Sequence, residues 1–139
     1  MDIIVEHVPE KPGLALLILN GDLDANSFRA VIAAGRSLYA DGSRDLLLDL
    51  SGVSLMSSSG IVALHSLALI MRGEQSPDLE QGWNAMHAVS DYVDESTGFE
   101  RHFKLLAPTR RVRHTLDTTG FVQTFEIFDE RQAALEAFT

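Results

Sequence analysis

The first half of the chain alternates short apolar runs with turn-forming residues. Apolar runs at residues 3–5 and 14–19 are separated by residues 9–13, which contain two prolines and a glycine. Short apolar runs on either side of such a turn are typical of a hairpin or of two adjacent β-strands. A third run at residues 46–50 is nearly continuous, as expected for a central strand that is covered on both faces. The pattern therefore predicts two neighbouring strands and a buried third one.

Helical periodicity follows between these strands and after them. Asp24 or Asn26 can cap a helix that ends at Asp41-Gly42, and its apolar positions recur at spacings of three and four residues: Phe28, Val31, Ile32, Gly35 and Leu38. Further helices are predicted at residues 61–71, 109–119 (ended by Gly120) and 130–138, with strands at 103–107 and 121–128. Strands that alternate with helices predict an α/β fold, a mixed β-sheet of four to five strands packed by helices.

The negative charge of the chain is concentrated in one segment. Residues 74–100 carry seven acids and no Lys or Arg, whereas the other residues hold 13 acids against 11 bases. We expect an acidic, partly helical insertion within a single domain that spans residues 1–139. Ser76 can cap its helix and Pro77 suits the first position. One apolar stripe follows: Leu79, Trp83, Met86, Val89 or Ser90, and Val93. We expect this stripe to cover the helix at residues 61–71 or to enter a partner's groove.

The helix at residues 61–71 has no charged residue on any face, unless His65 is protonated. Val62 and Leu69 fall on a different side of it from Ile61 and Leu64. A helix that is apolar all round is either buried on all sides or presents a docking surface. The sequence leaves both interpretations open.

Three serines, Ser57, Ser58 and Ser59, precede Gly60 at the start of this helix. Free backbone N–H groups and the positive end of the helix dipole gather there. Simple N-capping needs one serine. A phosphoserine is the alternative, because a phosphate would be tolerated by the dipole while it repels a partner from an apolar surface.

The strand and the helix after it carry the sequence LLLDLSGVSLMSSSGIVAL at residues 46–64. Together with GDLDA at 21–25 and TTGF at 118–121, this sequence resembles the STAS family, over the whole chain except about residues 74–100. The resemblance implies a bacterial, cytoplasmic anti-sigma factor antagonist, a phosphoprotein in transcription regulation that binds an anti-sigma factor. That partner would be a serine kinase of GHKL type. The phosphoacceptor corresponds to Ser58, with Ser57 and Ser59 as alternatives, although Ser57 stands where the family usually has Asp.

Under this hypothesis the partner binds the helix and the serines at its start, and the partner-binding residues are Asp24, Ser57, Ser59, Gly60, Val62, His65 and Leu69. A second hypothesis is a non-phosphorylated STAS scaffold subunit of a larger signalling or transport assembly. The departure at Ser57 and the inserted helix favour this alternative more than the sequence of a typical family member would. Neither hypothesis fixes the oligomeric state, so a homodimer stays open.

Composition excludes several other classes of protein. The absence of cysteine rules out disulfides and thiolate chemistry, and the net charge of −9 argues against binding to nucleic acid. The longest apolar run, at residues 14–19, is too short for a membrane span, and the N-terminus lacks the features of a signal peptide. The five histidines have no metal-ligand spacing, and no nucleophile or phosphate-binding motif is present. We therefore expect no enzyme activity, no metal and no cofactor.

One basic cluster stands apart from this acidic background. Arg110, Arg111 and Arg113 lie early in a predicted helix, where cations oppose the helix dipole. They form a solvated face, or they pair with the acidic segment or with an acidic partner.

Overall fold

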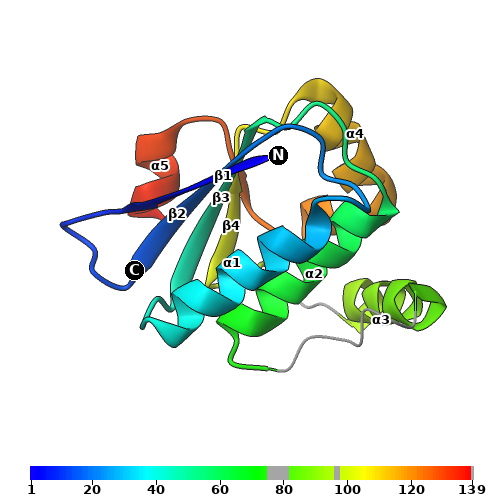
Figure 1. Ribbon diagram of the computed structural model, residues 1–139, viewed down its shortest axis with the longest axis horizontal. Helices are drawn as coiled ribbons and strands as arrows, with labels where there is room; N and C mark the ends of the chain where they lie inside the picture. Colours follow the sequence, from blue (N-terminus) through cyan, green and yellow to red (C-terminus); the bar gives the residue numbers. More distant parts are fainter. Residues whose placement is uncertain (75–81, 96–97, 139) are drawn as a thin grey trace.

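The computed structural model describes residues 1–74, 82–95 and 98–138, which build one mixed sheet covered by helices (Figure 1). The strands lie in sequence order across the sheet. β1 (Asp2–His7) is antiparallel to β2 (Leu14–Asn20), and β3 (Asp45–Gly52), β4 (Phe103–Leu106) and β5 (Ile127–Phe128) follow in parallel. The predicted hairpin, the buried third strand and the mixed five-stranded sheet are confirmed.

Helices cover both faces of the sheet. α1 (Phe28–Ala40) and α2 (Ser58–Met71) lie side by side across one face, with α3 (Gly82–Glu95) against α2 and α4 (Arg110–Thr119) near the carboxyl end of β4 (Figure 1). α5 (Arg131–Glu136) lies on the opposite face. Alternation along the strands divides the core, because Leu46 and Leu48 point to the four-helix side and Leu47 points to α5.

Two local predictions are wrong. The segment at residues 121–128 is not a continuous strand: residues Phe121–Gln123 form a 3₁₀ turn, and only Ile127–Phe128 pairs with β4. This turn places Phe121 and Phe125 in the core with ring centroids 4.7 Å apart. The cap of α1 is Ser27, whose hydroxyl donates to the Asp22 carbonyl at 2.7 Å. Asp24, a predicted cap, instead accepts a hydrogen bond from the Asn26 amide.

α3 lies against α2, as its apolar stripe predicts. Val89 and Tyr92 are buried, whereas Met86 and Val93 are partly buried against the same core. Ser90 is exposed, so Val89 is the stripe residue at that turn. Tyr92 did not belong to the predicted stripe. The predicted cap at Ser76-Pro77, Leu79 and the side chain of Trp83 lie outside the described residues.

Within the described ranges, no helix is both long and apolar enough to cross a membrane.

Candidate protein-binding site at the start of helix α2

Two loops are joined by backbone hydrogen bonds at the start of α2. The Leu23 amide donates to the Leu55 carbonyl at 2.9 Å, and the Ser57 amide donates back to the Leu23 carbonyl at 3.0 Å. Gly60 sits beneath this junction, where an added Cβ would lie 2.7 Å from Met56 Cγ and 2.8 Å from the Leu23 carbonyl oxygen. Only glycine therefore allows α2 to approach the loop after β2 so closely.

The three serines differ in accessibility. Ser57 is the N-cap residue with an extended backbone, and its hydroxyl is buried without a hydrogen-bond partner among the described residues. Ser58, the first helical residue, is exposed, whereas Ser59 is half-buried. The geometry thus leaves Ser58 as the most accessible hydroxyl at the positive end of the helix dipole.

The body of α2 is buried on nearly all sides. Its eleven residues other than Ser58, Ser59 and Leu69 are buried against the sheet, α1 and α3. This burial explains why the helix is apolar all round. Among the predicted partner-binding residues, Gly60, Val62 and His65 lie below the surface, whereas Asp24 and Leu69 are half-buried. Their contact with a partner stays a prediction.

His65 is a buried polar residue in the interface between α2 and α3. Its ring centroid lies 4.5 Å from that of Tyr92, and its Nδ1 atom has no hydrogen-bond partner within the described structure. Burial, reinforced by the nearby Arg72 guanidinium, lowers the pKa of His65 to about 4. The imidazole is therefore neutral at physiological pH. The hydroxyl of the neighbouring Ser66 is also buried and unpaired among these residues.

A polar cluster lies next to His65 and includes Tyr92 near the carboxyl end of α3. The Tyr92 hydroxyl donates to the Glu100 carboxylate, which also accepts two hydrogen bonds from the Arg72 guanidinium, one of them from Nε at 3.0 Å. Burial and then the bond to Glu100 raise the pKa of the Tyr92 phenol, and the bond to Glu100 raises the pKa of Arg72. We call Arg72, Tyr92 and Glu100 the α3 clamp.

The α3 clamp gives one acid of the acidic segment an inward position. Glu100, the last residue of that segment, is only 7% exposed. The sequence left open whether Arg110, Arg111 and Arg113 pair with this segment. Within the described residues, the carboxylate nearest Arg113 in an ion pair is Asp129, at 3.8 Å. Sequence reasoning missed Arg72 and Glu100 as a pair because 28 positions separate them.

In the parts of the chain that the structure describes, no group of three potential metal-ligating side chains lies close enough to hold an ion.

The fold and this site define a small α/β domain in which an accessible serine, Ser58, is the first residue of a buried helix. The family model described as "Mlab, STAS domain" matches residues 7–77, so the chain belongs to the STAS domain family. No curated protein sequence matches the chain.

Solved structures share the fold over nearly the whole chain. An anti-sigma factor antagonist from Mycobacterium paratuberculosis is 22% identical, with a TM-score of 0.67 over 99% of this chain and 92% of that one. A protein from Thermotoga maritima, whose structure was solved as that of an anti-sigma factor antagonist, is 16% identical, with a TM-score of 0.68 over 98% and 93%. The phosphorylated Bacillus cell fate determinant SpoIIAA is 15% identical, with a TM-score of 0.59 over 97% of both chains. These similarities establish the fold.

Proposed function

We propose that this chain is a cytoplasmic, non-enzymatic regulatory domain of the anti-sigma factor antagonist kind. Its partner is an anti-sigma factor that is also a serine kinase of GHKL type, and Ser58 is the phosphoacceptor. The exposed position of Ser58 at the first turn of α2 is the observation that carries this proposal. The structural similarity to SpoIIAA, which has been solved in a phosphorylated form, supports it.

The local physics of α2 suits a phosphate switch. A phosphate at Ser58 would add a charge of about −1.5 to −2 next to the free N–H groups of the first helical turn, which favour an anion. The fold would therefore tolerate the modification. A partner that must remove water from the surface around Ser58 and Leu69 would instead be repelled, because a desolvated charge is costly at an interface.

Phosphorylation by the cognate kinase with ATP tests this proposal. Mass spectrometry should find one phosphate on the wild type and none on Ser58→Ala. Ser57→Ala should still be phosphorylated, because the Ser57 hydroxyl is buried. A phosphate outside residues 57–59, or none with a kinase that binds the domain, would contradict the proposal.

A second candidate is a non-phosphorylated STAS scaffold subunit. The observation that favours it is the cover of α3 over His65, one of the predicted partner-binding residues. Under this proposal residues 74–100 are an insertion within the single domain, and the insertion changes which partner binds. If a partner protein binds the wild type and Ser58→Asp equally well and forms a stable complex with both, the scaffold function is favoured over the phosphorylation switch.

A further inference from the structure

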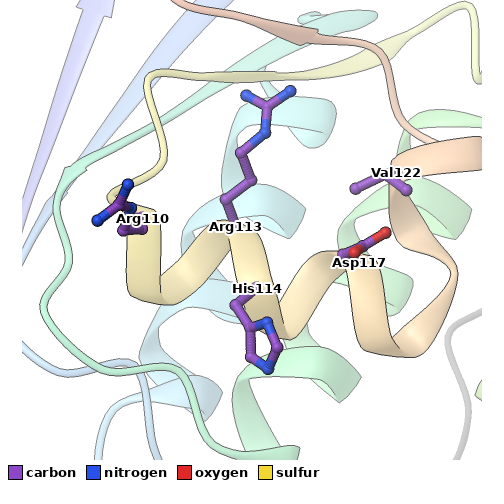
Figure 2. Close-up of a pocket in the computed structure, with 5 residues that line it drawn as sticks. All are labelled: Arg110, Arg113, His114, Asp117 and Val122. Atoms are coloured by element: carbon purple, nitrogen blue, oxygen red, sulfur yellow. The ribbon is translucent and has the colours of Figure 1, made fainter.

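The outer face of α4 carries a strip of basic side chains. Arg110, Arg113 and His114 are exposed, and Arg110 precedes Arg113 by three residues and His114 by four, so the three lie on one broad side of the helix. With Asp117 and Val122 they line an open depression of about 410 Å³ (Figure 2). We call Arg110, Arg113 and His114 the α4 strip.

The fold gives the α4 strip little compensation for its charge. Two arginines in the first turns of a helix oppose the helix dipole. Arg113 reaches Asp129 only at 3.8 Å between exposed side chains, and such pairs stabilise little. Within the described residues Arg110 forms no ion pair. The α4 strip is basic, whereas the chain as a whole carries a net charge of −9.

We propose that the α4 strip binds an acidic segment of a partner protein. Charge complementarity selects the chemistry of the partner, since carboxylates pair with guanidinium groups and a basic partner would be repelled by them. The shape favours an extended segment over a small ion. Figure 2 shows that the side chains of Arg113 and His114 leave the helix in different directions, so the strip is an open surface and not an enclosed pocket.

The strip lies close to the start of α2. The Thr109 hydroxyl, at the N-cap of α4, donates to the Val53 carbonyl at 3.3 Å, which joins the start of α4 to the loop that leads into α2. Parallel strands also place the carboxyl ends of β3 and β4 at the same edge of the sheet. A partner at the α2 site can therefore contact the α4 strip as well, but the strip needs no phosphate on Ser58.

An NMR titration of the whole chain tests the proposal. The probe is a short synthetic peptide that alternates glutamate with serine, and its matched control replaces each glutamate with glutamine. We expect the glutamate peptide to shift the amide signals of residues 110–114 and 117, and the glutamine peptide to leave them unchanged. The shifts should shrink as salt is added, because exposed charges are screened.

One double variant and two single variants make the test specific. Arg110→Ala and Arg113→Ala together should weaken peptide binding by about tenfold. Arg111→Ala is the matched control, since Arg111 has the same charge and is exposed on another side of α4, and it should weaken binding by less than about twofold. Asp117→Asn should strengthen binding, because it removes a carboxylate that lines the depression.

Three results would overturn the proposal. They are equal binding of the two peptides, equal losses in the Arg111 variant and the double variant, and saturation by inorganic phosphate at the affinity of the peptide, which would indicate a small-anion site. Ser58→Asp should leave peptide binding intact. The failure of the phosphate switch and the failure of the α4 strip can therefore be distinguished.

Discussion

Ser57, Ser58 and Ser59 are neighbours in the sequence but meet different environments. Ser57 is the helix cap with a buried hydroxyl, and Ser58 is the exposed first residue of α2. A run of identical residues gives no sequence signal for this difference, which arises because the loop before α2 is held against Leu23. Of the three candidate phosphoacceptors, Ser58 is therefore the most accessible.

Ser58→Asp should leave the fold intact and weaken partner binding. A carboxylate at a helix N-terminus stabilises by about 0.3–1 kcal/mol, whereas a charge at a desolvated interface costs several kcal/mol. Thermal melts and binding isotherms of the same preparation measure both effects, with Ser58→Asn as the uncharged control. A large fall in melting temperature would show that Ser58 is structural.

His65 should make stability depend on pH. Its pKa in the folded state is about 4, below its ordinary 6.5, so the unfolded chain binds the proton more readily. The contribution of His65 is therefore complete above pH 6.5 and is lost as the pH falls from 6.5 to 4, by about 3 kcal/mol at most. His65→Phe should retain the contact with Tyr92 and flatten this dependence in urea unfolding.

The quantity that isolates His65 is the difference in slope between wild type and variant. His114→Gln, an exchange of an exposed histidine, is the control and should leave the slope unchanged. Equal slopes for wild type and His65→Phe would contradict the buried, neutral imidazole.

At the scale of elements, the sequence predicted the helices whose ends are determined by neighbouring residues. α4 is confirmed because both of its ends are encoded locally: Thr109 accepts a hydrogen bond from the Val112 amide, and Gly120 ends the helix with φ of 86°. The strand expected at residues 121–128 is wrong over most of its length, because Phe121 from a 3₁₀ turn and Phe125 from the bend after it reach the core as they would from a strand. Apolar content alone does not separate the two conformations.

The contacts of α3 show how much of the site the sequence could predict. The apolar stripe of this helix predicted its position over α2. The α3 clamp could not be predicted, because Arg72 precedes the acidic segment, Glu100 ends it, and 28 positions separate the two residues. Glu100 carried no signal that distinguished it from the solvent-exposed acids around it.

Val89→Asp should detach α3 from α2. Val89 is 4% exposed, and an unpaired carboxylate at such a position costs several kcal/mol. We expect the apolar side of α2 to become accessible, which the fluorescence of a hydrophobic dye measures together with a lower melting temperature. The neighbouring Ser90 is exposed, so Ser90→Asp adds the same charge and should change stability by less than about 0.5 kcal/mol. Equal effects of the two variants would show that α3 does not depend on this contact.

At the scale of the whole molecule, the two faces of the sheet have unequal cores. The four-helix side contains Phe103, Phe121 and Phe125 among many fully buried residues, whereas α5 covers a smaller cluster with Ala134 and Leu135. α5 has six residues and the strand before it has two. Regions with few buried apolar contacts open at lower free energy than the rest of a domain.

Native-state hydrogen exchange should therefore show that the amides of α5 open before those of β2 and β3. Leu135→Ala should lower the opening free energy of α5 by about 1–3 kcal/mol and leave β2 and β3 nearly unchanged. A single opening free energy for all of these elements would mean that the domain unfolds as one unit.

The cover of α3 over α2 has a consequence for the growing chain on the ribosome. Synthesis proceeds from the N-terminus, and domains begin to fold while they are made. Once Met71 has emerged, the strands β1 to β3 and α1 can form. The outer side of α2 stays uncovered until Val89 and Tyr92 have been synthesised, and the α3 clamp cannot form before Glu100 has been added. The most apolar helix of the protein is thus exposed during this interval. Slow translation of residues 72–100 would lengthen the exposure and would favour aggregation or capture by a chaperone.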